Sequence, residues 1–136
     1  MAANDRSRTP DSEKITINLG HVDLGQVELL VREGFYSHRT DFIRTAIRNQ
    51  LDRHGDAVKK AVARQRLDLG LRHIGREDLE AAVARGEALD IRVLGLAVIA
   101  TDVTPELAHR AIASIHVLGA LQASPAVRAA LGDRIR

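Results

Sequence analysis

The chain is 136 residues long, enough for one ordinary domain or two small ones. Apolar residues make up 45% and charged residues 28%, which is the balance of a soluble globular protein. The absence of cysteine excludes disulfides, thiolate metal sites and thiol catalysis. Aromatic residues account for only 2%, so base stacking on aromatic side chains is not expected. With 20 basic and 18 acidic side chains, the charge is too even to indicate a nucleic-acid partner by itself.

We expect a cytoplasmic protein with no membrane contact. No stretch approaches the roughly 18–20 consecutive apolar residues of a membrane span. Residues 1–13 are polar and lack the apolar core of a signal peptide.

The first predicted elements are a flexible arm and a strand. Residues 1–12 are rich in Asn, Asp, Ser, Arg and Pro and have no apolar repeat, which predicts the arm. A strand is predicted over residues 14–19, where Ile15, Ile17 and Leu19 alternate with polar side chains. The strand is expected to end before the glycine that follows.

Two helices are predicted next. Asp23, followed by Gln three residues later, predicts the N-cap of the first helix, and Gly34 supplies its left-handed stop. Ser37 predicts the N-cap of the second helix, which runs to about Arg53. The apolar residues of the second helix fall on one face and predict a buried stripe of Phe42, Ile43, Ala46, Ile47 and Leu51.

The second half of the chain contains a repeat, after a polar helical connector over residues 57–66. Residues 91–95 (IRVLG) recur 24 positions later as residues 115–119 (IHVLG). We interpret each copy as a short strand ending in glycine and followed by a helix, so that successive strands are parallel. Ser/Thr-Pro pairs start the two helices, and a worn earlier copy is expected over residues 67–70 with a helix over 77–85.

The order strand, helix, glycine-containing turn, helix resembles the ribbon-helix-helix family of CopG-like DNA-binding regulators. The resemblance rests on the strand over 14–19, the turn over 34–37 (GFYS) and residues 41–48 (DFIRTAIR). It implies an α+β fold. In this fold residues 13–54 form an intertwined dimer and 55–66 a helical connector. From the internal repeat, and not from the resemblance, we expect residues 67–136 to form a module of strand–helix repeats for oligomerisation.

The strand has no partner nearby in its own chain, so its counterpart in a second chain would complete an antiparallel ribbon. Lys14, Thr16 and Asn18 share its polar face, and a two-stranded ribbon fits the major groove of DNA. Family resemblance implies the same three positions as base readers. The alternative is an ordinary amphipathic strand whose polar face meets water. The expected dimer core comprises Ile15, Ile17, Leu19, Phe42, Ile43 and Ile47.

The start of the second helix is the expected phosphate-contacting element. A helix N-terminus offers free amides and the positive end of the helix dipole. Resemblance to the family implies that Ser37, His38 and Arg39 clamp the DNA backbone, with His38 contributing when protonated. Arg6 and Arg8 in the arm either add salt-sensitive contacts or belong to a disordered tail.

Neither an enzyme nor a cofactor or metal site is expected. The chain has no GxSxG, P-loop or GxGxxG pattern and no HxH or HExxH. Nickel-responsive relatives of the family carry a cysteine ligand, which this chain lacks. The histidines are therefore interpreted as surface or interface side chains: His21, His38, His54, His73, His109 and His116.

The sequence predicts a homodimeric transcriptional regulator, a repressor, that binds double-stranded DNA and assembles further through its C-terminal module. One alternative is the antitoxin of a toxin–antitoxin pair, which would sequester a protein toxin with that half. Another is an architectural or partition protein that coats DNA, against which the near-balanced charge weighs.

Overall fold

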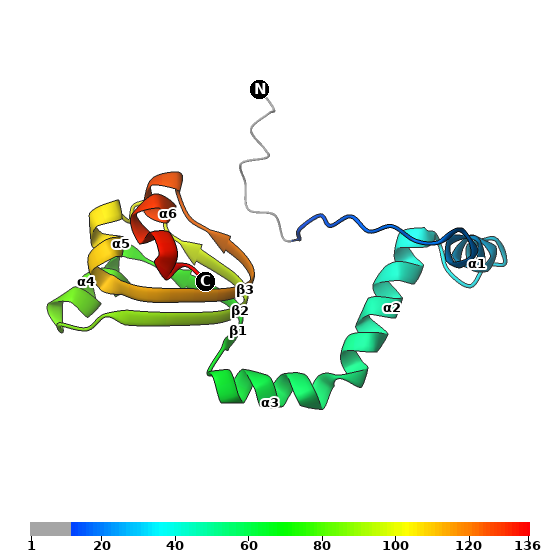
Figure 1. The fold of residues 1–136 in the computed structure, drawn as a ribbon, viewed down its shortest axis with the longest axis horizontal. Coiled ribbons are helices and arrows are strands. Elements are labelled where there is room, and N and C mark those ends of the chain that lie inside the picture. Colours follow the sequence, from blue (N-terminus) through cyan, green and yellow to red (C-terminus); the bar gives the residue numbers. More distant parts are fainter. Residues whose placement is uncertain (1–11) are drawn as a thin grey trace, which may run out of the picture. The chain divides into compact units, whose positions relative to one another are not determined.

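The computed structural model describes residues 12–136, which form two compact units, Ser12–Ala61 and Val62–Arg136 (Figure 1). Apart from Ser12, the arm expected over residues 1–12 lies outside the described residues, as do Arg6 and Arg8. The chain combines helices with a three-stranded sheet, which agrees with the expected α+β class. Among the described residues, none of the helices is long and apolar enough to cross a membrane.

The first unit is built on α1 (His21–Arg32) and α2 (Arg39–Arg53) and includes the start of α3 (Gly55–Gln65). The prediction that α1 starts at an Asp23 cap is wrong. Gly20 is the N-cap, and its carbonyl oxygen accepts the Leu24 N–H at 3.0 Å. Asp23 lies inside the first turn instead, where the helix dipole favours a carboxylate.

The predicted stop at Gly34 is confirmed, since its φ is +89°. Gly34 N donates to Val31 O and Phe35 N donates to Leu30 O, both at 3.0 Å. This pair of bonds satisfies carbonyls at the end of α1 and is the Schellman arrangement that glycine favours.

The second unit is a β/α module (Figure 1). Its sheet is parallel throughout, in the order β1-β2-β3. The pentapeptides 91–95 and 115–119 lie side by side in register. Thr104 and Ser124 cap α5 and α6, each hydroxyl accepting a backbone N–H at 3.1 Å. The elements are β1 (Asp68–Ile74), α4 (Arg76–Ala84), β2 (Leu89–Ile99), α5 (Pro105–Ala111), β3 (Ile112–Gln122), α6 (Pro125–Leu131) and the 3₁₀ turn η2 (Gly132–Arg134).

The expectation that each strand ends at its glycine is wrong, because all three strands continue past it. Gly70, Gly95 and Gly119 are neighbours in register, with φ of +111°, +140° and +127°. These backbone angles are open to glycine and strained for other residues. Figure 1 shows β3 bending sharply part of the way along. The glycines therefore form a column inside the strands.

The main core lies between the sheet and its helices. Ile91, Val93 and Ile115 on the strands have no exposed surface. They pack in one cluster with residues of α4, α5 and α6, including Leu79, Ala108 and Leu131. In β2 the buried side chains alternate with partly exposed ones, so one face of the sheet meets the helices and the other does not.

Candidate nucleic-acid interface

Residues 14–19 form no strand within the single chain. Lys14, Thr16 and Asn18 are exposed, and so are the apolar residues between them, with Ile15 at 73% and Ile17 at 60%. A strand needs a partner for its backbone N–H and C=O groups, and the rest of the first unit is helical. The predicted ribbon accordingly stays a prediction that requires a second chain.

The apolar side of this segment lies near the helices of its own unit. Ile17 and Leu19 line a hollow of about 290 Å³ together with residues of α1 and α2. Val27 of α1 and Ile43 of α2 form part of its wall. Ile15 does not line this hollow, and Lys14, Thr16 and Asn18 are exposed like the apolar residues between them, so the division of the segment into a core face and a DNA face stays a prediction.

The stripe predicted to be buried on α2 is not buried in the single chain. No residue of α2 is fully buried, Phe42 and Ile43 are half-buried, and Ile47 and Leu51 are exposed. Phe42 contacts Tyr36 edge-to-face, with ring centroids 5.0 Å apart. Two packed helices are too few to bury the whole apolar face that each of them carries. The unit thus presents an apolar surface of the kind that a second copy would cover.

The N-terminus of α2 differs from the prediction by one residue. The N-cap is His38 rather than Ser37, and its Nδ1 accepts the Asp41 N–H at 3.1 Å. The Asp41 carboxylate in turn accepts the Ser37 N–H at 2.9 Å. Sequence reasoning missed the role of Asp41, although its position three residues after His38 has the spacing of a capping box.

These hydrogen bonds determine which donors the residues predicted to contact phosphate can present. An imidazole whose Nδ1 accepts a hydrogen bond carries its proton on Nε2 when neutral. His38 is exposed, so its neutral ring can donate a hydrogen bond from Nε2 to a group outside the chain. Arg39 lies 3.5 Å from Glu28, in an exposed ion pair that water screens and that leaves guanidinium donors free.

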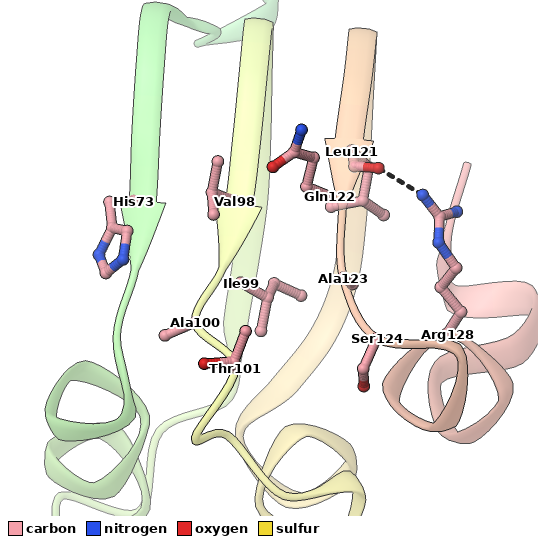
Figure 2. A pocket seen from close by; sticks show the side chains of 10 residues that line it. All are labelled: His73, Val98, Ile99, Ala100, Thr101, Leu121, Gln122, Ala123, Ser124 and Arg128. Carbon is pink, nitrogen blue, oxygen red and sulfur yellow. Dashed lines mark hydrogen bonds between the residues drawn. The ribbon is translucent and has the colours of Figure 1, made fainter. Parts of the chain in front are cut away.

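A second hollow, of about 610 Å³, lies in the module at the carboxyl ends of the strands (Figure 2). His73, Val98 and Gln122 line it from β1, β2 and β3. The guanidinium of Arg128 donates to the carbonyl oxygen of Leu121 at its edge. Its lining mixes polar and apolar groups and includes none of the predicted DNA-contacting residues.

Among residues 12–136, no group of three or more His, Asp or Glu side chains is arranged to hold a metal ion. One carboxylate of the module, that of Asp90, has a clearly shifted pKa. The hydrogen bond from Ser114 Oγ lowers the pKa of Asp90, partial burial opposes this effect, and the positive charge of Arg92 lowers it further. The folded chain therefore favours the ionised form of Asp90 more than an unfolded chain does.

The sequence model of the Ribbon-Helix-Helix transcriptional regulator family matches residues 10–128. The match spans the first unit and most of the module. Comparisons with curated proteins and with solved structures found no match.

Proposed function

The chain belongs to the Ribbon-Helix-Helix transcriptional regulator family, and from this premise we propose that it is a homodimeric repressor that inserts an antiparallel β-ribbon into the major groove. Family membership implies a DNA-binding transcriptional regulator. The observation that carries the finer proposal is the segment 14–19, which has no strand partner in the single chain and leaves Ile15 and Ile17 exposed, while Ile17 and Leu19 line a hollow beside α1 and α2.

In the proposed dimer the two copies of residues 14–19 pair and satisfy each other's backbone groups. Ile15, Ile17 and Leu19 join Phe42, Ile43 and Ile47 in a shared core. The paired strands then present two sets of Lys14, Thr16 and Asn18. Lysine donates to guanine acceptors, asparagine pairs with adenine in bidentate fashion, and threonine contacts a thymine methyl group or donates.

The start of α2 would position the ribbon on the DNA backbone. The amides of the first helical residues have no acceptor inside the helix. With the Asp41 N–H taken by His38, the amides of Arg39 and Thr40 remain for a phosphate oxygen. The Ser37 hydroxyl, His38 Nε2–H and Arg39 guanidinium add donors around the same point. These contacts would fix orientation and carry no sequence information.

Higher-order assembly through the C-terminal module is the remaining part of the proposal. One ribbon reads few base pairs, so dimers on adjacent half-sites gain specificity if they bind cooperatively. The module has its own buried core, which favours a folded assembly unit over an antitoxin tail that folds on its toxin.

The test compares site-specific binding of two variants to the DNA upstream of the coding region by fluorescence anisotropy. Thr16→Ala/Asn18→Ala should lose the preference for this DNA over an unrelated duplex while retaining weak, salt-sensitive binding. The matched control is Thr45→Ala/Asn49→Ala on α2, which should keep the preference. Retention of the preference by the ribbon variant would contradict base reading by residues 14–19.

A further inference from the structure

Two columns of apolar side chains run across the three strands of the module and flank the glycine column. The strand register places Leu94 between Leu69 and Leu118 in one column. It places Leu96 between Leu71 and Ala120 in the other. We name these residues the leucine ridge: Leu69, Leu71, Leu94, Leu96, Leu118 and Ala120.

The leucine ridge lies on the face of the sheet that the helices leave open. Ile91, Val93 and Ala97 of β2 are fully buried in the core with the helices. Side chains alternate along a strand, so Leu94 and Leu96 point to the opposite face. Both are partly exposed, as this placement requires.

The leucine ridge is the main apolar surface of the module. Leu69 is 71% exposed, Leu71 69% and Leu118 48%. These three are all of the exposed large hydrophobic residues of the module within the described part of the chain, and all three belong to the leucine ridge. Neither column contains a charged residue. A gathered patch of this kind marks an interaction surface, whereas single exposed leucines do not.

The proposed homodimer supplies the occupant of this surface, a second copy of the module. A dimer brings two copies of the module together, and their connection to one dimer raises the local concentration of each for the other. A surface that packs on itself about a two-fold axis must be self-complementary. The leucine ridge meets this condition, because antiparallel docking sets the column of Leu94 on the partner's column of Leu96.

The side chains that border the leucine ridge form one row across the strands on each side of it, and these two rows are also compatible with a two-fold axis. On the amino side of the columns lie Arg92 and His116, and on the carboxyl side lie His73, Val98 and Gln122. Antiparallel docking sets the first row against the second, so the Arg92 cation does not meet its own copy. Arg92 is in addition paired with Asp90 at 3.5 Å.

We infer that the leucine ridge is the surface through which the modules of two chains pack on each other. This inference rests on the proposed function, in which the chain forms a homodimer, and it names the surface on which the two modules of that dimer pack.

Cysteine cross-linking of the full chain tests the inference, because the natural sequence contains no cysteine. The Leu94→Cys/Leu96→Cys double variant places each cysteine opposite one of the partner, and a short bis-maleimide that spans the ~10 Å between packed sheets should link it into covalent dimers. The matched control is Ala129→Cys, an exposed position on α6. Cross-linking at the leucine ridge should be faster than at the control by on the order of tenfold or more. Adding Leu69→Thr/Leu71→Thr should slow it, and threonine suits a strand, so the fold is retained.

Sedimentation and DNA binding of the same samples distinguish failure of the inference from failure of the proposed function. Equal cross-linking at the leucine ridge and at Ala129→Cys, in a dimer that binds DNA, would overturn the inference and leave the proposed function standing. A monomeric sample without DNA binding would overturn the proposed function and the inference with it.

Discussion

The carbonyl group of Gly70 occupies the space that a side chain on Gly95 would need. A Cβ on Gly95 would lie 2.9 Å from the Gly70 carbonyl carbon and closer still to its oxygen. Gly119 stands in the same relation to Gly95, with 3.0 Å between a Cβ and the Gly95 carbonyl carbon. The backbones of successive strands therefore approach each other at this column more closely than any side chain allows.

Gly95→Ala should destabilise the module strongly, and Gly70→Ala serves as its control. Both glycines have positive φ, so alanine is strained at each by about 1–3 kcal/mol. A Cβ on Gly70 meets nothing within 4 Å, so only Gly95→Ala adds a backbone clash. Chemical denaturation should show Gly95→Ala losing about 1–3 kcal/mol more than Gly70→Ala. Equal losses would contradict the role of close approach.

The sequence shows that the glycines recur, but it did not reveal that they lie inside the strands. A glycine after IRVL and IHVL has the pattern of a strand end. The strands continue because the alternation of buried side chains goes on past the glycine, with Ala97 and Ile99 of β2 buried in the core. The parallel direction was predicted, since helices connect the strands, whereas the pairing of 91–95 with 115–119 within one chain was not.

The cap of α2 predicts a difference between two substitutions of His38. His38→Ala removes the acceptor for the Asp41 N–H and should cost about 1 kcal/mol of stability. His38→Asn restores an N-cap acceptor and should recover most of that loss. Thermal unfolding measures both variants.

Measurements of DNA affinity should distinguish the capping role of His38 from its proposed phosphate contact. If His38 donates from Nε2, His38→Asn should bind DNA more weakly than wild type despite its restored stability. Equal affinity would remove His38 from the DNA contacts and leave it as a capping residue alone.

The lowered pKa of Asp90 predicts acid sensitivity that depends on Ser114. Because the folded state favours the ionised carboxylate, its contribution to stability is present above the pKa of the unfolded chain. It is lost as the pH falls through the lower pKa of the folded state. Ser114→Ala removes a hydrogen bond of 2.5 Å and should raise the pKa of Asp90 toward its ordinary value, as followed by NMR titration. Ser124→Ala, which removes the cap of α6, should leave that pKa unchanged.

Ile47 predicts how dimerisation depends on the exposed face of α2. It is exposed in the single chain, so Ile47→Ser should cost the monomer little. Ile47 is 47% exposed in the single chain, so the proposed dimer buries about half of this side chain in each of its two copies, which together contributes about 1.5–3 kcal/mol. Sedimentation equilibrium should therefore show the dimer Kd rising by on the order of 100-fold. Asn49→Ser on the same helix is the control, and an equal effect there would contradict a core role for Ile47.

The first unit shows where sequence reasoning fails for a physical reason. The helices, the Gly34 stop and the alternation of residues 14–19 are local features, and they were predicted. The caps were misplaced because Ser37 and Asp23 are stronger general candidates than His38 and Gly20. Burial of Ile47 and pairing of residues 14–19 depend on a second chain, so they do not follow from one chain's local sequence.

Amide hydrogen exchange over residues 14–19 in the dimeric protein tests the central claim most directly. If the two copies pair as an antiparallel ribbon, alternate amides along the segment should exchange slowly, because only every second N–H points to the partner strand. Dilution to the monomer should abolish this protection. Exchange of all the amides in this segment at the rate of an unstructured chain, in a sample that sedimentation shows to be dimeric, would contradict the ribbon.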